Sequence, residues 1–191
     1  DNPERGFSYK HDGPLDMRMN PERGAPARDW LARCSAEKLS TALTLGGDEP
    51  HAHTLAESIV AARTAQPIET TRQLRDVVDA ALPERTSEVD RKATAARVFQ
   101  AIRIAVNEEF TALDTFLQKL PHCLRPGGKV AILSFHSGED RRVKHHLREG
   151  FRCGIYSEIS QEIIRPSPKE IGENSRAASA KMRWAIRAVS G

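Results

Sequence analysis

The chain has 191 residues, of which 39% are hydrophobic, and its formal net charge at pH 7 is +3. This length and composition allow one good hydrophobic core, or one core with a small helical subdomain, and a soluble α/β protein is the natural expectation. No apolar run approaches the roughly 20 residues that a membrane helix needs, so the pattern excludes a membrane-spanning protein.

The cysteines limit the chemistry and the compartment. Cys34, Cys123 and Cys153 are far apart and odd in number, which supports neither a zinc knuckle nor a disulfide framework. We therefore expect no bound metal, reduced thiols and a cytoplasmic location. An organellar location stays open, because Asp1 already lies inside a motif-like run and the chain looks like the later part of something longer.

Residues 1–24 form the opening loop, which has the pattern of neither a helix nor a strand. Its stretch "RGFSYKHDGPLDMRMNP" mixes charged and apolar side chains and is punctuated by glycine and proline. A structural interpretation is that its apolar residues pin the loop to a core, namely Phe7, Leu15, Met17 and Met19.

Residues 25–92 are helical by pattern. The segments "PARDWLARCS", "HTLAESIVAARTA" and "TTRQLRDVVDAALPER" are separated by helix breakers, Gly46-Gly47, Pro50, Pro67 and Pro83. Thr70 or Thr71 is the expected N-cap of the third segment. Such short helices are unstable alone, so we expect them to pack together or on a larger body.

From Thr94 to Leu120, apolar residues recur every three or four positions, which predicts one long helix with a buried face. The segment "LRPGGKVAILSF" then supplies a helix stop, a tight turn at Gly127-Gly128 and an apolar run from Val130 to Leu133. An apolar run without alternation is typical of a strand covered on both faces in a parallel sheet.

A further helix is predicted in "HSGEDRRVKHHLRE", with Ser137 as its N-cap and with Glu139 and Asp140 in the positive first turn. The remaining sequence offers two extended stretches around a long polar loop, which we expect to pair antiparallel at the sheet edge. Helix, strand, helix and hairpin in this order predict the later half of a doubly wound α/β domain.

The end of the predicted strand is a candidate binding site. In open α/β sheets, ligands bind beyond the carboxyl ends of the strands, where "SFHSGEDR" falls. His136 could hydrogen-bond a substrate, Ser137 could expose its hydroxyl, and the helix amides could meet an anion. The alternative is structural: Ser137 and Asp140 cap the helix, and His136 is a packing residue.

Lysine and arginine gather in "EDRRVKHHLRE" and "SRAASAKMRWAIRA" more densely than the net charge suggests. These clusters would suit a polyanion, or they are two solvated faces.

Four segments together resemble the bacterial 16S rRNA (cytosine-N4)-methyltransferases, whose relatives also occur in organelles. They are "DNPERGFSYKHDGPLDMRMNP", "RVFQAIRIAVNEEF", "LRPGGKVAILSFHSGEDRRVK" and "IIRPSPKEIGENSRAASAKMR", in the family's order and at similar spacings. The resemblance implies the later half of a Rossmann-like class I methyltransferase domain with an inserted all-helical subdomain. Residues 1–24 would be an active-site loop, 25–92 an insertion for RNA recognition, and 93–191 the C-terminal part of the methyltransferase domain. One departure is Gly138, where the family usually has leucine.

The resemblance also implies roles for particular residues. Because the exocyclic amine of cytosine is a poor nucleophile, an enzyme must splay the base out, stack it and accept hydrogen bonds from the amine. Asp16 and His136 are the candidate catalytic residues. The candidate substrate-binding residues supply an aromatic surface, hydrogen bonds and phosphate contacts, and they are Phe7, Arg18, Trp30, Ser137, Asp140, Arg141 and Lys144.

The expected cofactor is S-adenosylmethionine, and the expected partner is 16S rRNA in the small ribosomal subunit. The cofactor-binding residues are expected upstream of Asp1, because no glycine pair here follows a strand and opens a helix. This chain alone should then bind the cofactor weakly or not at all. Two alternatives stay open: a stand-alone RNA-binding remnant that never methylates, and a class I methyltransferase that acts on protein or a small molecule.

Overall fold

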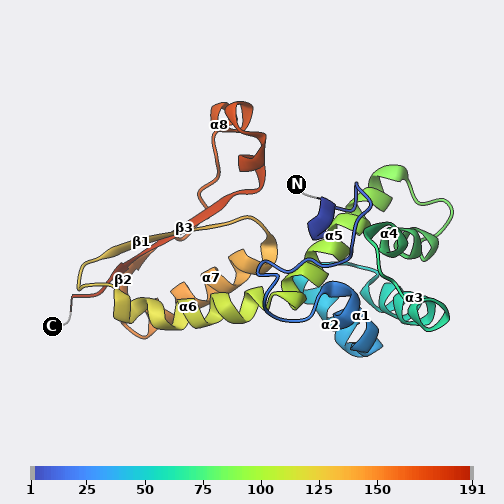
Figure 1. The fold of residues 1–191 in the computed structure, drawn as a ribbon. Coiled ribbons are helices and arrows are strands. Elements are labelled where there is room, and N and C mark those ends of the chain that lie inside the picture. The colour runs from blue at the N-terminus through green and yellow to red at the C-terminus, as the bar shows by residue number, and fades with distance from the viewer. Residues whose placement is uncertain (1–2, 190–191) are drawn as a thin grey trace. The chain divides into compact units, whose positions relative to one another are not determined.

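The computed structural model describes residues 3–189. The chain divides into two compact units, Asp1–Glu109 and Phe110–Gly191. The first unit is helical, and the second combines helices with a three-stranded sheet (Figure 1). The expected α/β class is confirmed. Among the helices of the described residues, none combines the length and the apolar character needed to cross a membrane.

The described part of the first unit begins with the opening loop and continues as a series of helices. Its elements are η1 (Pro3–Arg5), α1 (Ala27–Arg33), α2 (Ala36–Gly47), α3 (Ala52–Ala65), α4 (Thr71–Ala80) and α5 (Glu88–Val106). Ser35, Thr70 and Ser87 cap α2, α4 and α5 by accepting a hydrogen bond from a backbone amide of the first turn. Thr70 and Gln73 complete a capping box, which confirms the predicted N-cap.

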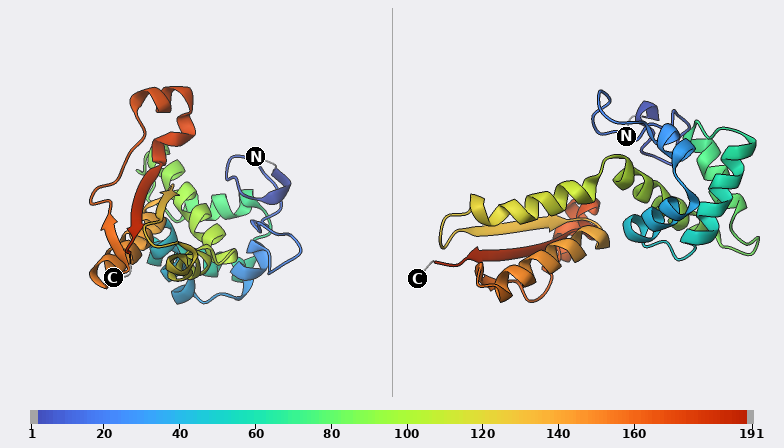
Figure 2. Two further views of the ribbon diagram at one scale, coloured as in Figure 1. Left: turned by 90° about the vertical axis from the view of Figure 1, so that its left-hand side faces the viewer. Right: turned by 90° about the horizontal axis from the view of Figure 1, so that it is seen from below.

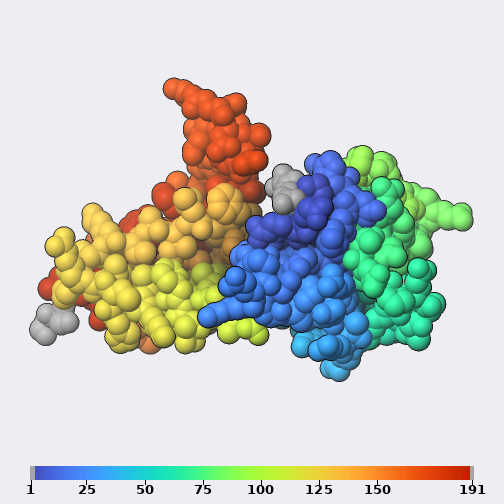
Figure 3. Space-filling model, viewed as in Figure 1, coloured from blue at the N-terminus to red at the C-terminus, as the bar shows by residue number. Residues whose placement is uncertain are grey.

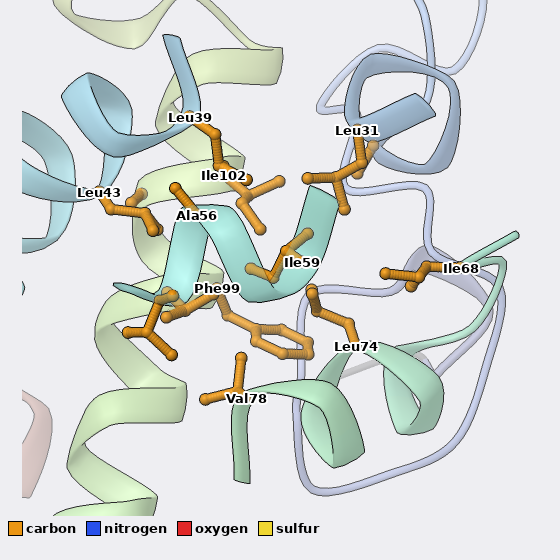
Figure 4. Packing of buried hydrophobic residues seen from close by; sticks show 14 of the residues in the cluster. Leu31, Leu39, Leu43, Ala56, Ile59, Ile68, Leu74, Val78, Phe99 and Ile102 are labelled. Atoms are coloured by element: carbon orange, nitrogen blue, oxygen red, sulfur yellow. The ribbon is translucent and has the colours of Figure 1, made fainter. Parts of the chain in front are cut away.

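The apolar faces of these helices share one core with the opening loop. Figure 4 shows the Phe99 ring of α5 next to Ile59 of α3 and Val78 of α4. Burying an aliphatic or aromatic side chain of this size contributes about 1.5 to 3 kcal/mol, so the joint core stabilises helices that would be marginal alone. The expectation that the short helices pack together is confirmed.

The Gly46-Gly47 pair was expected in a turn between helices, and this is wrong. Both residues are buried in the last turn of α2 against α5. A Cβ at Gly47 would lie 2.6 Å from the Arg97 carbonyl oxygen, and one at Gly46 would lie 3.0 Å from the Ala101 Cα. The glycines therefore allow two helix backbones to approach closely, which a breaker pattern does not reveal.

The predicted single helix from Thr94 to Leu120 is also wrong. Helix α5 ends at Val106, and α6 (Glu109–Cys123) begins after Asn107 and Glu108. Glu108 adopts a left-handed conformation with φ of 50°, which a continuous α-helix cannot contain. The apolar spacing continues across the break because both helices bury a face. Phe99 and Ile102 pack in the core of the first unit, and Leu117 and Leu120 pack in the core of the second unit.

The second unit contains α6 and a three-stranded antiparallel sheet with strand order β1-β3-β2. Its further elements are β1 (Lys129–Ser134), α7 (Ser137–Arg152), β2 (Tyr156–Ile159), α8 (Pro168–Glu173), η2 (Ser175–Ser179) and β3 (Lys181–Arg187). The order of helix, strand, helix and hairpin follows the prediction, and the pairing of β2 with β3 confirms the expected antiparallel pair. Figure 2 shows β3, in red, running alongside β1.

Strand β1 differs from the prediction of a parallel strand covered on both faces. Its partner within the described residues is β3, and the two strands are antiparallel. One face of the sheet packs on α6 and α7 through a core that includes Leu117, Leu147 and Ala185. On the open face, Ala131 and Leu133 lie opposite Trp184 and Met182, and the Leu133 side chain is 61% exposed. The apolar side chains of β1 thus alternate between the two faces of the sheet, and in the described residues one of these faces is covered by helices.

The connection between β2 and β3 carries α8 and η2. Figure 3 shows this segment, in orange-red, standing out from the surface of its unit. Its exposed Ile171 and its mostly exposed polar side chains contribute little to the core.

Candidate functional site

The opening loop is fixed to the first unit by main-chain hydrogen bonds. The Leu15 amide donates to the Glu69 carbonyl oxygen at 2.8 Å, and the Asp16 carbonyl oxygen accepts from the Ala27 amide at 2.7 Å. Leu15 and Met17 are fully buried, whereas Met19 is 55% exposed. Phe7 packs, partly buried, against the same core. The pinning role predicted for the apolar residues is therefore confirmed for Phe7, Leu15 and Met17 and wrong for Met19.

Asp16 and Arg18 form a bidentate ion pair. The Arg18 Nε donates to Asp16 Oδ1 at 2.8 Å, and its Nη2 donates to Asp16 Oδ2 at 2.7 Å. Met17, between them, has a left-handed backbone with φ of 60°, a conformation that costs a non-glycine residue about 1 kcal/mol or more. This backbone conformation places the Asp16 and Arg18 side chains in direct contact.

The pairing determines the charge of Asp16. Hydrogen bonds from the Arg18 side chain hold the pKa of the Asp16 carboxyl below its ordinary value, so the group is ionised at neutral pH. A carboxylate has about four lone-pair positions, and Arg18 occupies only part of them. Asp16 is thus an oriented, partly exposed hydrogen-bond acceptor, and Arg18 orients it.

Three aromatic side chains of this unit, Phe7, Tyr9 and Trp30, are partly buried against its core. The Arg5 guanidinium lies 4.9 Å from the centre of the Phe7 ring. Tyr9 makes an edge-to-face contact with Phe99. Trp30, on α1, packs against the same core and keeps part of its surface exposed. Phe7 and Trp30 therefore combine a fixed position with an accessible surface.

A second group of candidate residues surrounds the start of α7, in the other unit. The expected N-cap, Ser137, is wrong: His136 caps the helix, because its Nδ1 accepts from the Glu139 amide at 3.3 Å. Glu139 Oε2 in turn accepts from the Phe135 amide at 2.8 Å, and Ser137 is the first helical residue. Histidine is a rare cap, so residue statistics favoured the serine beside it.

Asp140 pairs with Arg183, which is not among the predicted site residues. Both Arg183 Nε and Arg183 Nη2 donate to the Asp140 carboxylate, at 2.8 Å and 3.1 Å. Both residues are buried, and Arg183 lies on the covered face of β3 next to the fully buried Ala185. The alternation in "KMRWAIR" places this arginine on the inward face and is the signal that could have identified it.

Gly138 leaves no room for a side chain at the start of α7. A Cβ at this position would lie 2.6 Å from Cζ of Phe110. The same ring lies 3.5 Å from the Arg142 guanidinium carbon, and this arginine also approaches Asp114. The absent side chain thus leaves room for an aromatic ring at the start of α7.

The later turns of α7 present cations to an open hollow of about 480 Å³. We call its lining the basic face of α7, which consists of Arg141, Lys144, His145, Arg148, Glu149 and Arg152. Four of these side chains carry a permanent positive charge and one is an acid. A surface of this charge suits phosphate groups.

The structure brings Asp16 and Arg18 into contact, and Phe7 and Trp30 belong to the same unit. His136, Ser137 and Asp140 lie at the start of α7, with Asp140 turned inward to Arg183, whereas Arg141 and Lys144 line the basic face.

The sequence model of the MraW methylase family matches residues 1–188. The chain belongs to the MraW methylase family. The resemblance inferred from the four segments is confirmed.

Several curated proteins are similar to the chain. "Ribosomal RNA small subunit methyltransferase H 1" of Agathobacter rectalis is 50% identical over 98% of this chain and 55% of its own length. The protein of the same name from Lachnoclostridium phytofermentans is 48% identical over 98% and 52%. "Ribosomal RNA small subunit methyltransferase H" of a Cyanothece species is 44% identical over 98% and 60%. The chain thus spans about half the length of these curated relatives.

Proposed function

We propose that this chain belongs to an enzyme that transfers a methyl group from S-adenosylmethionine to the N4 amine of a cytosine in 16S rRNA. Family membership and the names of the relatives support methylation of small-subunit rRNA. The observation that carries the cytosine assignment is the Asp16 carboxylate, which is ionised, oriented by Arg18 and partly exposed.

The proposed role of Asp16 follows from the chemistry of the amine. The lone pair of the cytosine N4 is delocalised into the ring, so the amine attacks an electrophile poorly. A carboxylate that accepts an N–H hydrogen bond polarises that bond and directs the single lone pair of the amine toward the donor methyl. As the new N–C bond forms and the S–C bond breaks, the N–H proton would leave to this carboxylate and then to water. Phe7 and Trp30 supply partly exposed aromatic surface on which a splayed base can stack. S-adenosylmethionine supplies the methyl group when bound.

The residues present do not form an ordinary donor site. Within the described residues, the turn at Gly127-Gly128 precedes strand β1, and Gly46-Gly47 lies inside α2, so neither is a loop between a strand and a helix. We propose that the donor-binding residues lie in a part of the enzyme outside this chain. Such a part would pair with the second edge of β1, extend the sheet into a Rossmann-like one and cover its open apolar face.

The rRNA contacts are proposed for the basic face of α7 and for the helices of the first unit. Arg141 and Lys144 would bind phosphate groups of the rRNA. Ser137, at the start of the same helix, would lie near that RNA strand. His136 and Asp140 already hold Glu139 and Arg183, so we propose that they position the start of α7 rather than exchange protons with substrate. The cysteines are compatible with a cytoplasmic or organellar matrix, which we propose as the compartment.

The test is methyl transfer from S-adenosylmethionine to small-subunit rRNA by the full-length protein. Asp16→Asn should lower turnover about tenfold to a thousandfold while RNA affinity stays nearly unchanged, because an amide is a weaker acceptor of similar shape. Asp12→Asn is the matched control, since Asp12 is an exposed carboxylate of the same loop that faces Arg72. RNA binding without any methyl transfer by the wild-type protein would favour the RNA-binding alternative, and normal turnover in Asp16→Asn would reject the role of Asp16.

A further inference from the structure

Asn107 makes three side-chain hydrogen bonds at the end of α5. Its Nδ2 donates to the carbonyl oxygens of Arg103 and Met17, each at 2.8 Å. Its Oδ1 accepts from the Met19 amide at 2.7 Å. The side chain thus ends its own helix and holds the opening loop, 90 residues away in sequence at Met17.

The two loop bonds fall on both sides of Arg18. The Met17 carbonyl and the Met19 amide bracket that residue, so the Asn107 amide fixes the backbone that carries the guanidinium. The Met17 amide is held separately by the Arg5 carbonyl oxygen at 2.9 Å. Because Met17 is left-handed and fully buried, this backbone depends on external contacts to stay in place.

We propose that Asn107 is a positioning residue that holds the Met17 backbone and thereby the Asp16–Arg18 pair. Only a short side-chain amide offers two donors and an acceptor in this geometry. Aspartate would keep the acceptor for Met19 but would turn an oxygen toward the carbonyls of Met17 and Arg103. The consequence for turnover rests on the proposed function of Asp16, whereas the geometry can be tested without any activity.

The variants are Asn107→Ala and Asn107→Asp, with Gln100→Ala as the matched control. Gln100 lies on the same helix and also donates from a side-chain amide to a carbonyl oxygen, that of Gly46 at 2.7 Å, without touching the loop. The geometric readout is the pKa of the Asp16 carboxyl, measured by carbon-13 NMR titration of the 191-residue chain. The catalytic readout is kcat and KM for methyl transfer by the full-length protein.

In Asn107→Ala, the Asp16 pKa should rise toward its ordinary value, because Arg18 is no longer held against the carboxylate. The kcat should fall about tenfold to a hundredfold with little change in the KM for RNA. In Asn107→Asp, the kcat should fall by at least as much. Gln100→Ala should leave the Asp16 pKa and kcat unchanged. An unshifted Asp16 pKa in both Asn107 variants would overturn the proposal. A raised pKa with normal turnover would uphold the positioning by Asn107 and would instead reject Asp16 as the group that acts on the amine.

Discussion

The Asp16–Arg18 pair links the stability of the first unit to pH. Arg18 holds the pKa of Asp16 below the ordinary value of 3.8, so the pair stabilises the folded state fully above that value. The stabilisation is lost as pH falls through the depressed folded pKa. The free energy of unfolding of the wild type should therefore approach that of Asp16→Asn in acid.

Denaturant unfolding at several pH values between 2 and 6 checks this prediction. In an Arg18→Gln background, the Asp16→Asn change should lose this pH dependence, because the partner that lowers the pKa is gone. A difference between wild type and Asp16→Asn that stays constant down to pH 2 would contradict the pairing.

At the scale of elements, the basic face of α7 predicts a salt effect. Replacing Lys144 with glutamine should weaken RNA binding almost equally for any sequence and should reduce the slope of log K against log salt by about one unit. Glu149→Gln removes the acid of the same hollow and should act in the opposite direction. Binding titrations at several salt concentrations with two unrelated RNAs measure both effects. A sequence-dependent loss in Lys144→Gln would indicate base contact instead of phosphate contact.

Elements followed from the sequence where their determinants are local. The cap at Thr70 and the turn at Gly127-Gly128 depend on neighbouring residues and were predicted. The break at Asn107 and Glu108 was not, because apolar spacing alone cannot tell that a helix passes from one core to another. The helical burial of Gly46-Gly47 was missed for a similar reason, since its cause is a second helix.

The candidate site shows the same limit. Asp16 and Arg18 were singled out, yet their pairing depends on the left-handed Met17, which composition does not reveal. Arg183 and Asn107 were missed because their partners, Asp140 and the opening loop, lie 43 and about 90 residues away.

At the scale of the whole molecule, the open face of the sheet predicts different behaviour for this chain and for a longer protein. Leu133→Lys should change the stability of the 191-residue chain little, because the side chain is already 61% exposed, and it should reduce binding of a hydrophobic dye. In the full-length protein, the same change should cost about 2 kcal/mol or more if a further part covers that face.

Val89→Lys is the control, since Val89 is 75% exposed on α5 and should tolerate lysine in both proteins. Thermal or denaturant unfolding of the wild type and the two variants, each in the short and the long protein, gives the comparison. Equal tolerance of Leu133→Lys in the long and short proteins would show that nothing covers the sheet there.

The strand order β1-β3-β2 also has a consequence for the time course of folding. The helical unit is built largely from helices that are neighbours in sequence. Strand β1 pairs with β3, which follows it by about 50 residues and is the last of the three strands to leave the ribosome, so β1 cannot pair until β3 has been synthesised. During that interval the apolar residues of β1 have no strand partner from this sheet. Synthesis therefore passes through a stage in which the first unit can already be folded while the strand beside the candidate site is still exposed to misassembly and to chaperones.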